Sequence, residues 1–217
     1  MSLCAGAISF GDVYWPRFGA RMLASIERAD PQPDQILVVS DREIDVPSWV
    51  ELVVVEQGRR FLMYNDLAQH CRCDWLLPVG VDDEMMPDGF VPVESDADVI
   101  CYPGQQVGEA TWVAATTDPN ALAGAWNAPN NPLNGGVIWR TSTLLEIPVR
   151  DYIYQDEVLW AEWSYFGKTL QLDSRIRVVW HRWRGSNSWP ANTEGERQAQ
   201  DFKRKLREGL IQKGIPE

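Results

Sequence analysis

Two adjacent carboxylates, Asp82 and Asp83, follow the apolar stretch 75–81 and precede a third acidic residue, Glu84. Neighbouring negative charges at the end of a strand repel one another and cost stability unless a cation or hydrogen-bond donors compensate for them. Carboxylate oxygens are hard ligands that suit Mg²⁺ or Mn²⁺, and such ions usually bind phosphate oxygens and water as well. Asp82 and Asp83 are therefore candidate metal ligands. The alternative is a solvated acidic turn, because Asp-Asp pairs are common.

A second acidic pair, Asp156 and Glu157, opens a stretch with helical character, residues 156–166. Carboxylates in the first turn of a helix are stabilised by the helix dipole, so capping alone explains their position. A carboxylate at the mouth of a site can equally remove a proton from an acceptor hydroxyl. Asp156 is therefore a candidate general base.

His181 is one of two histidines, and a polar segment rich in hydrogen-bond donors follows it. It is a candidate third metal ligand, while Arg182, Arg184 and Ser186 are candidate phosphate contacts. The alternative is a histidine at the end of a strand beside a basic loop. The other histidine, His70, lies within a predicted helix and is interpreted as structural.

Strand and helix signals alternate along the chain, which predicts an α/β fold with a mostly parallel central sheet flanked by helices. Apolar stretches predict strands at 5–10, 35–40, 52–55, 75–81, 98–102, 137–140 and 176–180. Helical spacing of apolar residues predicts helices at 17–28, 61–71, 156–166 and 194–212.

Acidic residues follow three of the predicted strands, at Asp12, Asp41 and Asp82–Asp83. Ligands of parallel sheets bind outside the carboxyl ends of the strands, so these side chains are expected to lie at one edge of the sheet. Residues 104–134 are rich in Gly, Pro, Asn and Thr and are predicted to be irregular. A long irregular segment is usually functional or disordered, and this one, with Trp112 and Trp126, is a candidate acceptor-binding loop.

The order and spacing of these motifs over residues 5–190 resemble the family 2 glycosyltransferases of the GT-A fold. That family has a strand ending in aspartate, an asparagine on a helix, and a strand ending in D-x-D-D followed by a proline. Later come a glycine-containing strand, an E-D pair that opens a helix closed by a glycine, and a segment with histidine or arginine that ends in G-S-x-S. The corresponding elements of this chain are 36–41, Asn65, 75–83 with Pro87, 134–140, Gln155–Asp156 with Gly167, and 180–188.

The resemblance implies a metal-dependent transfer of a sugar from a nucleotide-diphosphate-sugar donor to an acceptor hydroxyl, with inversion and one sugar at a time. Asp41 would face the nucleotide base, and Asp156 would be the base. A divalent cation, Mn²⁺ or Mg²⁺, held by Asp82, Asp83 and His181, would stabilise the leaving diphosphate. The acceptor, whether glycan, lipid, protein or modified nucleobase, is left open.

This sequence departs from the family pattern at three positions. Gly80 stands where the family often has its first aspartate, Gln155 replaces the glutamate of the E-D pair, and Glu162 replaces a common arginine. These departures leave room for a non-catalytic carbohydrate-binding or assembly protein of the same fold. A nucleotidyltransferase is the other alternative, although the glycine-rich basic loop expected after its first strand is missing.

Composition limits the remaining possibilities. The 217 residues carry a net charge of −11, which disfavours broad attraction to nucleic acid or anionic membranes. No apolar run is long enough to span a membrane, no signal peptide is recognisable and the four cysteines lack zinc-site spacing, so a cytoplasmic protein with reduced thiols is expected.

The predicted organisation is a GT-A domain at 1–190, with a donor half at 1–103 and an acceptor half at 104–190, and a charged helical extension at 191–217.

Overall fold

A computed structural model describes residues 1–56, 60–108, 111–128, 131–133, 135–181 and 193–213. Its centre is a seven-stranded sheet in which β9 runs antiparallel to both neighbours and every other neighbouring pair is parallel. The strands, in spatial order, are β10 (Leu170–Leu172), β6 (Val99–Tyr102), β9 (Gly136–Arg140), β4 (Trp75–Val79), β1 (Leu3–Ser9), β2 (Gln35–Ser40) and β3 (Glu51–Val54). The predicted mostly parallel α/β sheet is confirmed.

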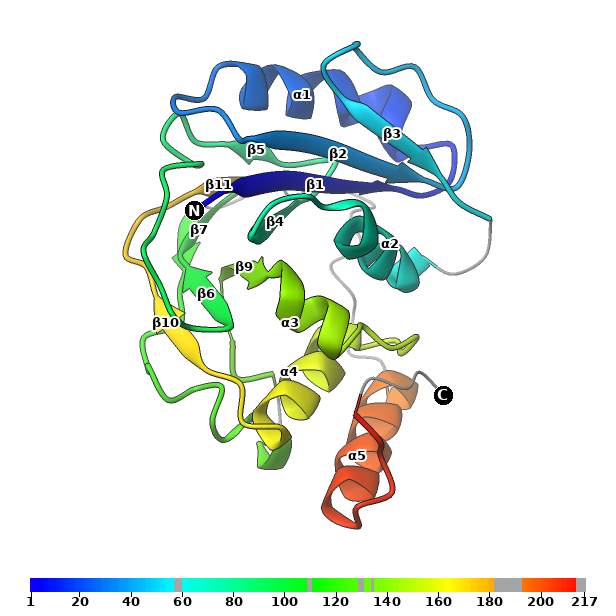
Figure 1. Ribbon diagram of the computed structural model, residues 1–217, viewed down its shortest axis with the longest axis vertical. Coiled ribbons are helices and arrows are strands. Elements are labelled where there is room, and N and C mark those ends of the chain that lie inside the picture. The colour runs from blue at the N-terminus through cyan, green and yellow to red at the C-terminus, as the bar shows by residue number, and fades with distance from the viewer. Residues whose placement is uncertain (57–59, 109–110, 129–130, 134, 182–192, 214–217) are drawn as a thin grey trace.

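Helices cover both faces of this sheet, as Figure 1 shows. A π-helical turn, Trp15–Gly19, leads into α1 (Ala20–Glu27) on one face, while α2 (Met63–His70), preceded by a 3-10 turn at Arg60–Leu62, lies on the other together with α3 (Thr141–Glu146) and α4 (Gln155–Tyr165). Side chains alternate along β1 accordingly. Leu3 and Ala5 pack in the cluster that contains α1, whereas Cys4 packs in the cluster that contains α2 to α4.

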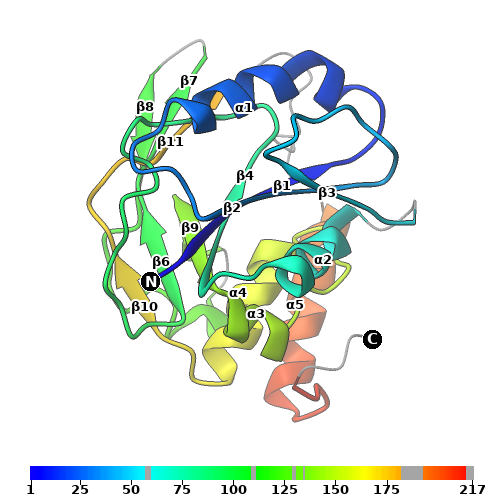
Figure 2. The same ribbon diagram turned by 45° about the horizontal axis from the view of Figure 1, so that its top comes forward.

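A second, four-stranded sheet, which the sequence did not predict, has the order β5 (Glu84–Met85), β11 (Val178–His181), β7 (Gly104–Val107) and β8 (Trp112–Ala114). Figure 2 shows β7, β8 and β11 side by side. The expectation that 104–134 is irregular is therefore wrong for two segments, and a 3-10 turn, Ala125–Asn127, lies farther along. Short strands without strong alternation are hard to detect because their partners, not their own pattern, define them.

The C-terminal helix α5 (Thr193–Arg207) packs against α4. Phe202 and Leu206 are fully buried in a cluster with Val158 and Ala161 of α4. With α5 on one side and the sheet on the other, residues 157–164 of α4 are buried all around, as expected for a core helix. The Nζ atom of Lys203 lies 2.5 Å from Glu157 Oε1 in this interface. Lys203, which belongs to the charged helical extension predicted from the sequence, is buried.

None of the helices described in the structure combines the length and apolar character required to cross a bilayer.

Candidate functional site

The acidic turn that follows β4 is fastened to α1. Arg21 on α1 donates from Nη2 to the backbone carbonyl of Asp82 at 2.6 Å, and its Nε lies 3.2 Å from Glu84 Oε1. The Met85 amide donates to Ser25 Oγ at 2.9 Å in the buried interface with the same helix. Two of these contacts are to backbone groups of residues 82 and 85, and together the three hold the turn against α1.

Asp83 folds back over Gly80, the position at which the sequence departs from the family pattern. A Cβ atom on Gly80 would lie 2.2 Å from Asp83 Oδ2, so the glycine makes the room that this carboxylate occupies. Burial and the negative charge of Asp82 raise the pKa of the Asp83 carboxyl to about 7. The Asp83 carboxyl is therefore both buried and next to a second acidic side chain, that of Asp82.

His181 lies beside this turn because β11 pairs with β5, in the register Val179 to Glu84. Its backbone amide donates to Asp83 Oδ1 at 3.4 Å, and its Nε2 lies 3.0 Å from Glu84 Oε1. The predicted grouping of Asp82, Asp83 and His181 in one place is therefore present. Among the described residues, however, no three His, Cys, Asp or Glu side chains are arranged to hold a metal ion. The carboxylates still fit Mg²⁺ or Mn²⁺, because these ions often take one or two carboxylates and complete their shells with substrate phosphates.

A cavity of about 270 Å³, here called the β4-end cavity, lies at the carboxyl ends of β1 and β4. Asp82 and Gly80 line it on the β4 side, and Gln155 at the start of α4 lines it from the other half of the chain. Four aromatic side chains complete the wall: Phe10, Tyr14, Phe61 and Tyr64. A pocket with apolar walls and few polar groups is the usual form of a small-molecule site, and rings of this kind suit a flat nucleobase.

A second cavity of about 180 Å³, here called the Asp156 cavity, adjoins the first. Tyr64 and Gln155 line both cavities, and Asp156 lines only the second. Asp82 and Asp156, 74 positions apart in the sequence, thus face neighbouring hollows that share a wall. Two candidate residues from the two predicted halves of the domain thus lie near each other in space.

Asp156 is held by one side chain from the opposite wall. Asn131 Nδ2 donates to Asp156 Oδ2 at 2.7 Å. The residue is exposed at the surface, yet the protein packed around its carboxyl and the neighbouring Glu157 raise its pKa, more than the hydrogen bonds from backbone amides and Asn131 lower it. Behind it, Lys203 pairs with Glu157 and donates to the Ala128 carbonyl at 2.7 Å.

Asp41 lies at the end of β2, where the sequence placed it, but outside both cavities. Its side chain is 2% exposed, and its carboxylate accepts from the Gly11 amide at 3.1 Å and from Arg42 Nε at 3.0 Å. These bonds join the ends of β1 and β2. The predicted phosphate contacts Arg182, Arg184 and Ser186 lie outside the described residues.

Several residues of the cavities were not identified as site residues from the sequence. Tyr14, Tyr64 and Asn131 are isolated polar or aromatic residues whose types are common in cores and loops, so no spacing marks them. Asn65, part of the family pattern, is a partial signal for Tyr64. Its own amide has another contact: Nδ2 donates to the Val149 carbonyl at 2.9 Å and Oδ1 accepts from the Val149 amide at 2.8 Å.

No protein-family model matches this chain, and no curated protein matches it. Solved structures with a similar fold include those of S. aureus TarS. The TarS 1–349 structure in complex with UDP-GlcNAc has a TM-score of 0.66 at 13% identity, over 95% of this chain and 66% of the TarS chain. The complex of the same protein with UDP has a TM-score of 0.65 at 13% identity, over 95% and 65%. The chain thus spans about two thirds of the length of the TarS chain that it matches. Together with the sheet topology, this similarity shows a GT-A-like fold.

Proposed function

We propose that this protein is a glycosyltransferase that moves a sugar from a nucleotide-diphosphate-sugar donor to an acceptor hydroxyl. One observation carries the proposal: on a GT-A-like fold, the β4-end cavity and the Asp156 cavity share a wall, with Asp82 in one and Asp156 in the other. UDP-GlcNAc and UDP, the ligands of the two TarS complexes, support a nucleotide-sugar as the donor class.

In this proposal the donor occupies the β4-end cavity, where its base lies among the aromatic side chains. The acceptor hydroxyl enters the Asp156 cavity, and Asp156 takes its proton as the oxygen attacks the anomeric carbon. A general base is most effective when its pKa lies near the working pH, so a raised pKa suits Asp156 to this role. Asn131 donates a hydrogen bond to one carboxylate oxygen and so helps to orient the group.

Asp82 and Asp83, with His181 beside them, would hold a Mn²⁺ or Mg²⁺ ion. When bound, that ion would offset the negative charge that develops on the leaving diphosphate. Arg21 would keep the turn in place for this purpose through its hydrogen bond to the Asp82 backbone carbonyl. With the base and the leaving group on separate sides of the sugar, the proposed reaction inverts the anomeric configuration.

The finer assignment to family 2 rests on the ordered motifs, including Asn65, Asp82–Asp83 and Asp156 with Gly167. Gly167 has a φ of 73° directly after α4 ends, the left-handed position at which a glycine closes a helix. Because the family's processive Q-x-x-R-W signature is missing from the sequence, we propose addition of a single sugar per binding event.

Donor binding provides the direct test. A panel of UDP-, GDP- and TDP-sugars, each with and without Mn²⁺, is screened by thermal shift on the wild-type chain and on Asp82→Asn. We expect stabilisation by one nucleotide class, dependent on Mn²⁺ and lost in Asp82→Asn, followed by slow hydrolysis of that donor. Asp88→Asn, an exposed aspartate in the turn that follows β5, is the matched control. Absence of any stabilisation, or equal stabilisation of Asp82→Asn, contradicts the proposal.

A further inference from the structure

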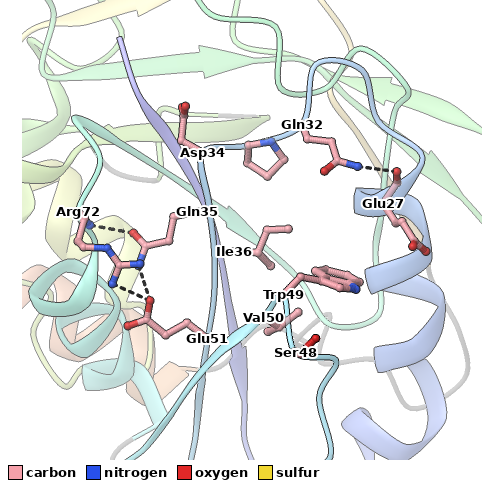
Figure 3. Close-up of a pocket in the computed structure, with 11 residues that line it drawn as sticks. Glu27, Gln32, Asp34, Gln35, Ile36, Ser48, Trp49, Val50, Glu51 and Arg72 are labelled. Atoms are coloured by element: carbon pink, nitrogen blue, oxygen red, sulfur yellow. Dashed lines mark hydrogen bonds and ion pairs between the residues drawn. The ribbon is translucent and has the colours of Figure 1, made fainter.

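A cavity of about 600 Å³, larger than the two cavities of the candidate site, shares no lining residue with either of them. It lies at the amino end of β2, between α1 and the segment that leads into β3 (Figure 3). Gln35 at the start of β2 lines it, whereas Asp41 follows the other end of the strand, roughly 20 Å away for a strand of this length. Its volume is within the usual range of about 300–1,000 Å³ for small-molecule sites. The cavity is therefore a separate hollow of suitable size.

One wall of this cavity is a fixed polar network, drawn with dashed lines in Figure 3. Gln35 Nε2 donates to Glu51 Oε2 at 3.0 Å, and Gln35 Oε1 accepts from the Arg72 amide at 2.8 Å. Arg72 Nη1 lies 2.7 Å from the same Glu51 oxygen. Because each partner holds the next, this wall is already ordered without a ligand, which lowers the entropy cost of binding.

The facing wall carries polar groups that have no partner. Within the described part of the chain, Glu27 Oε1 and Oε2, Ser48 Oγ and Trp49 Nε1 make no hydrogen bond or ion pair. Trp49 is 42% exposed. In Figure 3 its ring lies between the start of β3 and α1. The exposed ring of Trp49 and its indole N–H thus line the same cavity as the Glu27 carboxylate and the Ser48 hydroxyl.

The position of Glu27 also costs stability. It is the last residue of α1, where the negative end of the helix dipole disfavours a carboxylate, and the last turn contains no basic residue. An exposed tryptophan and a carboxylate at a helix C-terminus are both unfavourable in the free protein. A ligand that covers the ring and donates hydrogen bonds to the carboxylate would offset both costs.

We propose that this cavity binds a neutral carbohydrate, with a sugar ring on Trp49 and its hydroxyls bonded to Glu27 and Ser48. A sugar presents an apolar face that packs on an aromatic ring and a rim of hydroxyls that donate and accept. The lining holds three carboxylates, Glu27, Asp34 and Glu51, against one guanidinium, Arg72, so an anionic polymer is disfavoured. This inference extends the proposed function, because the cavity would hold a distant part of a glycan acceptor, but sugar binding here needs no turnover.

The test is calorimetric titration of the intact chain with chitotriose, cellotriose and maltotriose, without nucleotide. The variants are Trp49→Ala and Glu27→Gln, and Leu145→Ala, which removes another exposed apolar side chain on α3, is the control. We expect saturable binding of at least one trisaccharide to the wild-type chain and to Leu145→Ala. Trp49→Ala should weaken it at least about tenfold, the usual loss on removing an aromatic anchor. Thermal unfolding of each variant shows that it is folded.

Three results overturn the inference: no binding of any trisaccharide, equal binding by Trp49→Ala, or binding of spermidine in place of the sugars, which indicates a cation site. Asp82→Asn separates this inference from the proposed function. It should bind the trisaccharide normally while losing the nucleotide-sugar, whereas Trp49→Ala should keep nucleotide-sugar binding. Loss of trisaccharide binding and loss of nucleotide-sugar binding can therefore be told apart, because each is measured in a variant of the other site.

Discussion

The residue-scale question is how three carboxylates with similar intrinsic chemistry come to differ. Asp41 is enclosed and bonded by Arg42 and the Gly11 amide. Asp83 lies over Gly80 with its pKa raised to about 7, and Asp156 is exposed in a cavity with its pKa raised. Burial, a like charge and the number of donors decide these outcomes, not the residue type. These differences give distinct expectations for substitutions.

The first prediction concerns Asp156. In Asp156→Asn the hydrogen bond to Asn131 can persist through the amide oxygen, but the group no longer accepts a proton. We expect kcat for transfer to fall about 10²–10⁴-fold, the usual contribution of a general base, with nucleotide-sugar affinity unchanged. Steady-state kinetics and calorimetry measure the two quantities. Asp151→Asn, an exposed aspartate in the loop before α4, is the control, and normal turnover of Asp156→Asn excludes Asp156 as the base.

The second prediction concerns the pH dependence of stability. A folded-state pKa of about 7 means that Asp83 binds a proton between roughly pH 4 and 7, where the unfolded chain does not. Stability from this group therefore falls as pH rises toward 7. Asp83→Asn lacks this loss, so in EDTA its stability relative to wild type should be greater at pH 8 than at pH 5. Thermal unfolding at both pH values, with Asp88→Asn as control, measures the difference. A constant difference at both pH values contradicts the prediction.

At the scale of elements, α4 carries the candidate base at one end and a buried ion pair near the other. Glu162, which replaces the arginine common in the family, accepts from Arg150 Nε and Nη2, both at 2.7 Å, and the two side chains are 1% and 4% exposed. In this chain an arginine from the preceding loop therefore brings a positive charge to the helix.

The third prediction tests this pair. Glu162→Ala leaves the buried Arg150 guanidinium without its carboxylate, which we expect to cost about 3–5 kcal/mol of unfolding free energy in urea. The double variant Arg150→Met/Glu162→Leu should recover most of that loss, because two apolar groups leave no charge unpaired. Glu194→Ala removes the exposed partner of Arg197 and should cost no more than about 1 kcal/mol. A similar loss in the single and double variants would mean that packing, not charge, explains the effect.

The elements also show what the sequence could and could not predict. Residues 35–40 match β2 at both ends because this strand is an uninterrupted apolar run stopped by Asp41. β5, β8 and β10 are two or three residues long, and no local pattern marks a strand that short. Asp82 and Asp156 were predicted as site residues because one follows a strand and the other opens a helix, and both positions are recognisable in the sequence. Tyr64 and Gln155 were not identified as the shared wall, because only the tertiary structure brings these two residues to the same cavities.

At the scale of the whole molecule, the net charge of −11 works against an anionic donor. The long-range field of an acidic protein repels a nucleoside diphosphate, and added salt screens that repulsion. Groups at the donor site, including a bound cation, must therefore offset the electrostatic repulsion between the protein and the diphosphate. The acidic turn at Asp82–Asp83 adds to this background at the site itself.

The fourth prediction follows from this charge. In EDTA, the affinity for the nucleoside diphosphate that the donor screen identifies should rise as sodium chloride is added, since screening weakens the repulsion. With saturating Mn²⁺ the dependence should flatten or reverse, because the site itself then attracts the anion. Calorimetric titrations across a salt series, with the uncharged nucleoside as control ligand, measure both slopes. An affinity that falls with salt in EDTA would indicate a basic donor site, and the nucleoside should show no slope.

The Lys203–Glu157 contact bears on how the chain matures during synthesis. Glu157 leaves the ribosome 46 residues ahead of the lysine that neutralises it and ties down the Ala128 carbonyl. Until α5 emerges, α4 has an uncovered apolar side and an unpaired acid next to Asp156. A nascent chain that already contains Asp82 and Asp156 is therefore not yet fully folded around Asp156. We expect this part of the site to reach its final structure only when α5 packs against α4.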